Sequence, residues 1–533
     1  MDDQGGSVAL SRSDAGDAGP AAATLDVTRA EPAAASEVEA VTTGEHAATP
    51  GDTLRRQVAG GVRWGLIASV ATQVGRLAFV VALMRLLGPE NFGIVGQASV
   101  YIAITYIFLH LGTAANIIQR PHLTAADVGS AWWINVGLGV TLAAATLVGA
   151  PLLADFFRTE ELAAVLRVLS ICFVLKAMAV VPTALLYRAM RFRVIGTAEI
   201  ASTFLGGACA ILAAANGAGY WSLVVQTVAM DAIYLATLVR RAGLPRLTWS
   251  TSAARGLWSF SSRVMGAELV KFLSENSDKF LVARVLGATE LGFYSLAYRV
   301  LLLPLLMMEQ AGRVILPAFS RVQDDRVRLG HMFLQASESV ALVICPAMTL
   351  AILCAPTLVP AVLGDAWTPA VLPLQLLAGM TIQYLIVSVT PAVLLAVGRP
   401  DWEFRWSVFA MAVALLAFAV GVQWGITGVA AAYLVMGLLL TPIRLWVVGQ
   451  LIPLSLRGYV RVLAPALGSS AVLGLTWLAV AAALRGTAGG LVVTAVASVA
   501  GLAAYVVAAR IGWPKDVRHQ LEFARLVVRG GAP

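Results

Sequence analysis

The chain has 533 residues, of which 59% are hydrophobic and only 13% are charged, and its formal net charge is +8 at pH 7. Soluble domains are about half apolar and about a quarter charged, so this composition predicts a protein surrounded by lipid. It excludes a chain that is disordered throughout. The four cysteines show no CxxC or Cys/His spacing, which excludes a disulfide scaffold and predicts no metal site.

The N-terminal segment differs from the rest of the chain. Residues 1–53 hold ten acidic and two basic residues and no aromatic residue, so their charge is −8 and that of the remaining 480 residues is +16. A segment this polar cannot bury enough apolar surface to offset its ordering entropy. We therefore expect residues 1–54 to form a disordered, acidic, cytoplasmic tail. No basic flank leads into an early apolar run, so the segment is not a signal peptide.

Long apolar segments, separated by short polar breaks, follow from residue 62 onward. About 20 residues are needed to cross the hydrocarbon core, and these runs are too long for membrane strands and do not alternate as strands do. The sequence predicts an all-α integral membrane protein with about fourteen transmembrane helices. The expected spans are residues 62–86, 92–113, 129–153, 160–184, 195–216, 219–240, 256–284, 291–316, 332–356, 369–397, 404–423, 426–449, 461–484 and 489–511.

The basic residues predict the orientation of these spans. With the N-terminus in the cytoplasm, 22 arginine and lysine residues, Arg444 among them, fall at cytoplasmic connections and 4 at opposite ones. Basic residues concentrate on the cytoplasmic side of membrane proteins, so this bias favours a cytoplasmic-membrane protein with both termini inside. It also explains the positive charge without nucleic-acid binding.

Two stretches of the chain repeat one another. Residues 85–93 read RLLGPENFG and residues 284–292 read RVLGATELG, at an offset of 199. Residues 219–224 and residues 425–430 show a weaker similarity. Chance recurrence of glycine turns is the alternative, but both copies follow corresponding spans. Parallel repeats are one recurrent transporter plan, so we expect two pseudo-symmetric six-helix lobes around a central cavity. The expected lobes are residues 55–250 and 251–456, followed by two extra helices in 457–512 and a basic cytoplasmic tail in 513–533.

Polar residues inside two of the predicted spans indicate this cavity. One face of span 256–284 carries Glu268, Lys271, Glu275, Asp278 and Lys279. An ionised side chain facing lipid costs roughly 2.5–3.5 kcal/mol at mid-membrane, so this face must look into a polar interior. Asp278 and Lys279 lie nearer the outer end and could partly snorkel. The equivalent span 62–86 carries a milder stripe: Ser69, Thr72, Gln73 and Arg76.

Two interpretations of these residues remain open. In the structural one, Glu268–Lys271 and Glu275–Lys279 neutralise each other and hold the lobes together. In the functional one, cavity cations bind phosphate oxygens of an anionic substrate, and the other polar residues position them or carry a coupling ion. The candidate cations are Arg76, Lys176, Lys271 and Arg299, and the candidate cavity or coupling residues are Gln73, Glu268, Glu275, Asp278 and Lys279. Neither a catalytic residue nor a cofactor is expected, and the absence of a Walker motif argues against ATP as the direct driver.

The sequence also resembles a known family. The motifs that carry the likeness are residues 84–93 (MRLLGPENFG), 219–224 (GYWSLV), 278–288 (DKFLVARVLGA) and, most specifically, 291–299 (LGFYSLAYR). They resemble the polysaccharide transporter family of the multidrug/oligosaccharidyl-lipid/polysaccharide exporter superfamily, in its lipopolysaccharide and colanic-acid exporter branch. The likeness covers about residues 55–450.

The resemblance implies a two-lobed transporter of twelve to fourteen helices. It would flip a polyprenyl-diphosphate-linked oligosaccharide across the cytoplasmic membrane by alternating access, for cell-surface polysaccharide biosynthesis. Its implied partners are membrane lipid and the glycosyltransferase or polymerase machinery. Three alternatives stay open: a peptidoglycan lipid-precursor flippase, a multidrug or cation antiporter of the same superfamily, and a membrane glycosyltransferase or polymerase. The leading interpretation is not an enzyme.

Overall fold

The structure is a computed structural model. It describes residues 50–513 with gaps at 110–113, 115–116, 119, 121–122, 244–247, 252–271, 273–275 and 487–488. The chain divides into a unit Met1–Val58, of which only the start of one helix is described, and a unit Ala59–Pro533, which holds every other feature below. Almost all described residues are helical, and no strand occurs among them. The predicted all-α class is confirmed for this part of the chain.

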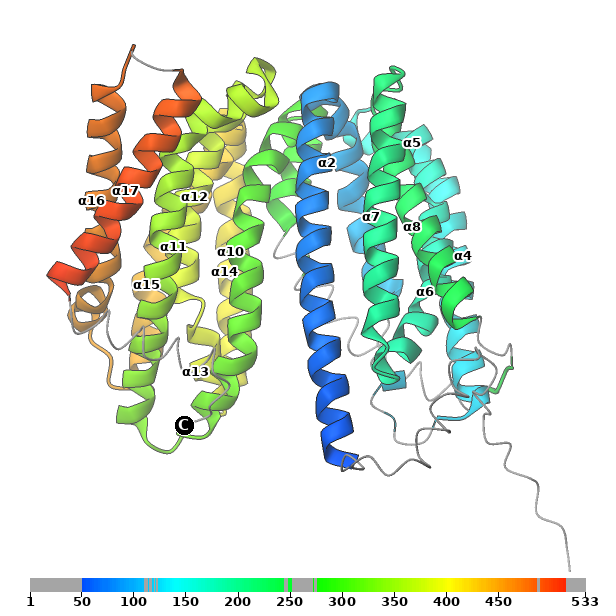
Figure 1. The fold of residues 1–533 in the computed structure, drawn as a ribbon, viewed down its shortest axis with the longest axis horizontal. Coiled ribbons are helices and arrows are strands. Elements are labelled where there is room, and N and C mark those ends of the chain that lie inside the picture. Colours follow the sequence, from blue (N-terminus) through cyan, green and yellow to red (C-terminus); the bar gives the residue numbers. More distant parts are fainter. Residues whose placement is uncertain are drawn as a thin grey trace, which may run out of the picture. The chain divides into compact units, whose positions relative to one another are not determined.

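In the first half of the chain, the structure describes six helices from end to end (Figure 1). They are α2 (Pro50–Leu109), α4 (Ala125–Phe157), α5 (Glu161–Leu169), α6 (Ile171–Arg188), α7 (Phe192–Ala215) and α8 (Trp221–Ala242). The start of α4 is fixed by a capping box, in which Thr124 and Asp127 bond each other's backbone N–H groups. Helices α7 and α8 lie side by side, and α6 packs against both α4 and α8.

In the second half, the elements described from end to end are eight α-helices and two short 3₁₀ segments. These are α10 (Ala288–Ser320), α11 (Arg326–Leu363), η1 (Asp365–Ala370), α12 (Val371–Val387), α13 (Thr390–Ala396), α14 (Pro400–Gly421), η2 (Val422–Trp424), α15 (Gly425–Gly449), α16 (Leu456–Ala483) and α17 (Gly490–Gly512). Helix α12 packs between α11 and α15, and α16 pairs with α17 along α11 (Figure 1).

Among the described residues, ten helical segments are long and apolar enough to cross a membrane. Two of these, Ala68–Tyr106 and Pro400–Gly449, each cover a pair of the predicted spans. The chain is thus a multi-pass membrane protein. Predicted span 256–284 lies mostly outside the described residues, as do residues 1–49 and 514–533 of the two predicted tails.

Several predicted boundaries shift. Helix α2 begins at Pro50, inside the segment predicted to be a disordered tail. The predicted span 160–184 is two helices that meet at Ser170, and it extends to Arg188. The predicted span 369–397 is interrupted after Val387, where two turn residues separate α12 from α13 and a proline occupies the first turn of α13. Proline lacks the N–H that a continuous helix needs, which accounts for the interruption.

The repeated motifs share one backbone geometry. The fourth residue of each copy is a glycine with positive φ: Gly88 at 73° and Gly287 at 91°. Residues with a Cβ rarely adopt this conformation, so each glycine permits the sharp bend between two helices. In the first copy the bend divides α2 into the two predicted spans 62–86 and 92–113.

The two motif copies also contact each other. A Cβ placed on Gly93 would stand 1.7 Å from the carbonyl oxygen of Ala288, and one placed on Gly292 would stand 2.2 Å from that of Pro89. Each contact joins the ninth residue of one copy to the fifth residue of the other. Such reciprocity is what a local two-fold axis between two equivalent segments produces. The repeat in the sequence is therefore a repeat in space at this junction.

Candidate functional site

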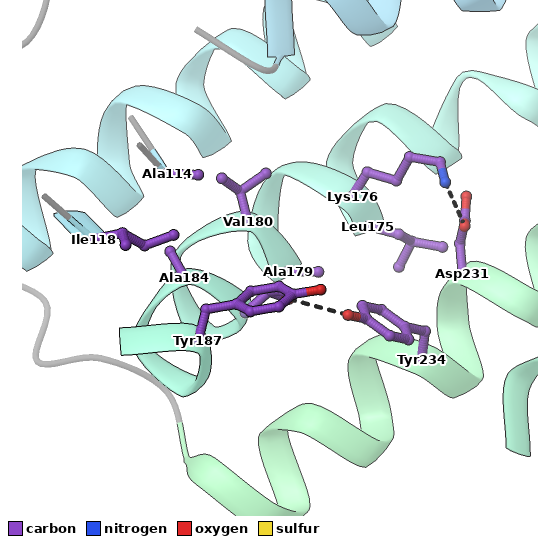
Figure 2. Close-up of a pocket in the computed structure, with 11 residues that line it drawn as sticks. Ala114, Ile118, Leu175, Lys176, Ala179, Val180, Ala184, Tyr187, Asp231 and Tyr234 are labelled. Atoms are coloured by element: carbon purple, nitrogen blue, oxygen red, sulfur yellow. Dashed lines mark hydrogen bonds and ion pairs between the residues drawn. The ribbon is translucent and has the colours of Figure 1, made fainter. Parts of the chain in front are cut away.

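A cavity of about 370 Å³ opens within the first half of the chain (Figure 2). It lies between α6 and α8 and residues 114 and 118, which follow the end of α2. Most of its wall is apolar, because alanine and branched aliphatic residues recur along α6 at helical spacing. Its polar lining residues are Lys176, Thr183, Tyr187, Asp231 and Tyr234.

An ion pair occupies one end of this cavity. The Lys176 Nζ lies 2.8 Å from the Asp231 Oδ1, and the two side chains are 35% and 13% exposed. The ammonium also stands 4.8 Å from the centre of the Tyr106 ring, within reach of a cation–π interaction. Lys176 is therefore a cavity cation, as predicted from the sequence, but its charge is matched by Asp231.

Asp231 is a site residue that the sequence analysis missed. It is the one acidic residue in the predicted span 219–240, and that isolation was the available signal. An ionisable residue within a membrane span indicates a functional site by default, with a partner to be sought. The sequence alone could not show that α8 places it against Lys176 of α6.

Hydroxyl groups occupy the rest of the polar wall. The Thr183 and Tyr234 hydroxyls are 3.3 Å apart and share a hydrogen bond. Figure 2 shows the Tyr187 and Tyr234 rings along the same side of the cavity. The Glu199 charge acts on both tyrosines and on the predicted cation Arg76, but Glu199 and Arg76 form no ion pair. Arg76 and its neighbour on the predicted stripe, Gln73, are both exposed.

Of the site residues predicted on spans 256–284 and 291–316, the structure describes only some, and these do not line the cavity between α6 and α8. Glu268, Lys271 and Glu275 lie outside the described residues. Asp278 does not snorkel, because it is 2% exposed and accepts a 2.7 Å hydrogen bond from the Tyr294 hydroxyl of α10. Lys279 donates to Asn276 Oδ1 at 3.0 Å, and its Nζ lies 3.6 Å from the centre of the Tyr298 ring. Asp278 and Lys279 thus contact tyrosines of α10, and Lys279 also contacts Asn276, which precedes it in the chain.

Arg299 of α10 is exposed. Together, the predicted cations within the described residues occupy two settings: Lys176 is paired with Asp231, whereas Arg76 and Arg299 are exposed. The described residues contain no group of three or more His, Cys, Asp or Glu side chains that could hold a metal ion.

A second charged cluster lies in the other half of the chain. Arg444 of α15, counted above among cytoplasmic connections, is inside the helical bundle and only 3% exposed. Its Nε donates to the Thr390 Oγ1 at 2.8 Å, and it forms an ion pair with Glu403. Its guanidinium stands 5.0 Å from the Trp406 ring. The sequence analysis missed this cluster, which joins α13, α14 and α15.

The comparison with protein families decides the identity of the chain. Residues 82–372 match the family described as polysaccharide biosynthesis protein. The chain belongs to this family. The match contains both copies of the repeated motif and the Lys176–Asp231 pair. The polysaccharide exporter resemblance seen in the sequence is confirmed.

Curated relatives in this family cover most of the chain. It is 26% identical over 398 residues to the lipopolysaccharide biosynthesis protein WzxC of Escherichia coli (strain K12), which is 73% of this chain and 80% of that protein. It is 25% identical over 412 residues to the teichuronic acid biosynthesis protein TuaB of Bacillus subtilis (strain 168), covering 76% and 85%. The succinoglycan biosynthesis transport protein ExoT of Rhizobium meliloti (strain 1021) is 28% identical over 54% of this chain and 58% of that protein.

Solved structures share the fold. The lipid II flippase MurJ, in an inward closed conformation, superimposes with a TM-score of 0.67, covering 85% of this chain and 100% of that one at 12% identity. An inward-facing multidrug resistance transporter of the MATE family superimposes with a TM-score of 0.54, covering 71% and 95% at 14% identity. The polysaccharide biosynthesis family member described here therefore has the fold of these transporters.

Proposed function

We propose that the protein moves a polyprenyl-diphosphate-linked oligosaccharide across the cytoplasmic membrane by alternating access, for the biosynthesis of a cell-surface polysaccharide. The observation that carries this proposal is the family match over residues 82–372 in a multi-pass membrane chain. Relatives covering most of the chain are named for lipopolysaccharide, teichuronic acid and succinoglycan biosynthesis, and ExoT is named a transport protein.

The arrangement that we propose has fourteen spans: two six-helix lobes, residues 55–250 and 251–456, and two further helices at the C-terminal end. Both termini lie in the cytoplasm in this arrangement. The reciprocal contact of Gly93 with Ala288 and of Gly292 with Pro89 supports it, since equivalent helices of two lobes would meet there. Alternating access then consists of one lobe rocking against the other.

The cations have separate roles in this proposal. Arg76 and Arg299, both exposed, bind diphosphate oxygens through charge-assisted hydrogen bonds, together with Lys271. Gln73, Glu268 and Glu275 line the same cavity between the lobes. We expect glycosyltransferases or a polymerase to supply and receive the cargo on the two sides of the membrane.

The test begins with a deletion of the gene in the organism of origin. We expect loss of one surface polysaccharide and accumulation of its lipid-linked precursor in the inner leaflet. That precursor, extracted from the deletion strain, is then placed in liposomes with and without the purified full-length protein. We expect the protein to make the precursor's sugar accessible to a periodate probe on the opposite face.

The same assay separates the alternatives. A peptidoglycan-precursor flippase would be essential for wall synthesis and would flip the peptidoglycan precursor in place of the accumulated one. A drug antiporter would confer resistance to cationic dyes on overexpression, and a glycosyltransferase would lengthen the sugar chain in the purified system. Any of these results, together with failure to flip the accumulated precursor, would contradict the proposal.

A further inference from the structure

The two charged residues that line the cavity, Lys176 and Asp231, have opposite charges. The ammonium and the carboxylate are 2.8 Å apart, so the pair is neutral as a whole. A diphosphate entering this end would meet the Asp231 carboxylate at close range, and a metal cation would meet the Lys176 ammonium. Both approaches are opposed by like charge in a site of low dielectric constant. The cavity therefore favours a ligand without net charge.

The hydrogen-bonding capacity of the lining is large for so small a cavity. Asp231 accepts one strong bond, from Lys176, so its carboxylate has acceptor capacity left over, and the Lys176 ammonium has further N–H donors. The Thr183 and Tyr234 hydroxyls bond each other and each keeps acceptor capacity. A ligand that both donates and accepts at several neighbouring positions would satisfy all four groups. Hydroxyl groups on a ring have that property.

The shape of the cavity agrees with this chemistry. Ligand sites are typically of about 300–1,000 Å³ with apolar walls and a few convergent polar groups. At about 370 Å³ the cavity admits a small part of an oligosaccharide and excludes the whole. The Tyr187 ring, 41% exposed, and the apolar faces of Val180 and Ala184 provide walls for the C–H faces of a sugar (Figure 2).

We propose that the cavity between α6 and α8 is a subsite for an uncharged sugar unit of the cargo, held by Lys176, Asp231, Thr183 and Tyr234. This inference rests on the proposed function and divides the cargo between two sites. The diphosphate is bound by exposed cations such as Arg76, and the sugar is bound by the neutral ion pair. It reassigns Lys176 from a phosphate-binding residue to a sugar-binding residue, because its charge is already matched.

The test measures binding of two probes to the purified full-length protein in lipid nanodiscs. One probe is the lipid-linked oligosaccharide extracted from the deletion strain, and the other is polyprenyl diphosphate without sugar. We expect Asp231→Asn and Thr183→Ala to weaken binding of the first probe by about tenfold, since one replaces a carboxylate acceptor by an amide and the other removes a hydroxyl. Thr183→Ala leaves the charge of the cavity unchanged, so it should leave binding of the second probe unchanged. Asp155→Asn, at an exposed acid of α4, is the matched control and should change neither.

The other outcomes overturn the inference. If the variants weaken both probes equally, or if Thr183→Ala weakens the sugar-free probe alone, the wild-type cavity binds phosphate. If neither affinity changes but the ion dependence of flipping does, the pair carries a coupling ion. In both cases the wild-type protein still flips the oligosaccharide, so the proposed function survives. Failure of the wild-type protein to bind or flip either probe is the distinct result that ends the proposed function itself.

A second measurement covers the case in which Asp231→Asn does not fold. A benzoylphenylalanine placed at Ile118, which lines the cavity and is 43% exposed, is photoactivated in cells of the organism of origin. We expect mass spectrometry of the adduct to give sugar fragment ions. The same residue placed at Val435 of α15, 52% exposed, should capture lipid chains only. Lipid chains alone at Ile118, or no adduct there, would contradict a sugar subsite.

Discussion

The indole Nε1 of Trp367 donates a 3.0 Å hydrogen bond to the backbone carbonyl of Met84, which lies 283 positions earlier in the chain. The ring is 1% exposed, and it packs edge-on against Phe92 and Phe293, with ring centres 5.8 Å and 6.1 Å away. These phenylalanines belong to the two halves of the chain. A single side chain of η1 therefore ties together the helices that follow both motif copies.

We expect Trp367→Phe to destabilise the protein by about 1–3 kcal/mol, because the buried Met84 carbonyl loses its donor while most of the ring volume stays. Trp367→Ala should cost about 3–5 kcal/mol, since it also leaves a cavity between the two phenylalanines. Thermal unfolding of the purified protein in detergent measures both. The control is Trp424→Phe at an indole that is 68% exposed, which should have little effect. Equal stability of Trp367→Phe and the wild type would refute the importance of the hydrogen bond.

The glycines of the motif contact give a second prediction. Gly93→Ala and Gly292→Ala each place a methyl group within 2.2 Å or less of a backbone carbonyl oxygen, and a backbone cannot yield as a side chain can. Overpacking of this kind costs about 1–3 kcal/mol or more. We expect lower melting temperatures and lower export for both. Gly137→Ala, where a Cβ meets nothing within 4 Å, is the matched control. An unchanged Gly93→Ala protein would show that the halves do not meet so closely.

The positions of most apolar helices within the described residues were predictable from the sequence, because the bilayer sets the length of an apolar run. The bend at Gly88 was also predictable from the sequence, since a glycine followed by a proline (Pro89) ends a helix. The sequence could not show that Gly93 and Gly292 serve a different purpose from Gly88 and Gly287. The first pair permits close contact and the second pair permits positive φ, and only the assembled fold distinguishes them.

The candidate site was less predictable than the fold. A charged residue in an apolar span indicates that it has a partner, but the sequence does not identify that partner. Lys176 was recognised and Asp231 was not, because they meet through the packing of α6 on α8. Arg444 was assigned to a cytoplasmic connection because it lies near the end of a predicted span. Its burial depends on Glu403 and Thr390, which come from two other helices.

The Lys176–Asp231 pair predicts a measurable coupling. Lys176→Met or Asp231→Ala alone leaves one charge without its partner, whereas the double variant removes both charges. Contacting charged residues typically show coupling energies of about 0.5–3 kcal/mol in a double-mutant cycle, and partial exposure places this pair within that range. Melting temperatures of the two single variants and the double variant give the coupling. Additive effects would mean that the two side chains do not interact in the membrane-embedded protein.

The buried cluster around Arg444 should be more sensitive to substitution than an exposed ion pair. Removing one partner of a buried pair costs about 3–5 kcal/mol, because the other charge is left uncompensated. We therefore expect Arg444→Met or Glu403→Gln to reduce the amount of folded protein sharply. The combined variant Arg444→Met/Glu403→Gln should recover part of the loss. Arg444→Lys should not substitute well, because one ammonium cannot reproduce the planar fork that serves Thr390 and Glu403 together.

An exposed pair of an arginine and a carboxylate provides the comparison for this cluster. Arg399 and Asp401 lie 3.2 Å apart, with side chains 42% and 47% exposed. Exposed pairs contribute about 0–1 kcal/mol, so Arg399→Met should leave the melting temperature nearly unchanged. If Arg399→Met and Arg444→Met cost the same, burial does not determine the importance of these arginines.

Arg76 tests the proposed diphosphate site. Arg76→Gln removes a charge that is exposed and forms no ion pair with Glu199, so it should leave folding and membrane insertion intact. Losing a charge-assisted hydrogen bond to phosphate costs about 1.5–3 kcal/mol, which corresponds to a reduction of about 10- to 100-fold in binding of polyprenyl diphosphate. Arg76→Lys should retain part of the affinity, because it keeps the charge. Arg485→Gln, at an exposed arginine after α16, is the control.

The comparison of Arg76→Gln with Arg299→Gln separates a shared cavity from two unrelated charges. If both arginines bind the same diphosphate, the two substitutions should lower affinity by less in combination than the product of their separate effects, because they share one ligand. Flipping of the lipid-linked oligosaccharide in liposomes should fall in parallel. If both single variants and the double variant flip at the wild-type rate while the protein level in the membrane is unchanged, then these cations do not face the cargo. The intramembrane charges would then serve to hold helices together, which is the structural interpretation that the sequence left open.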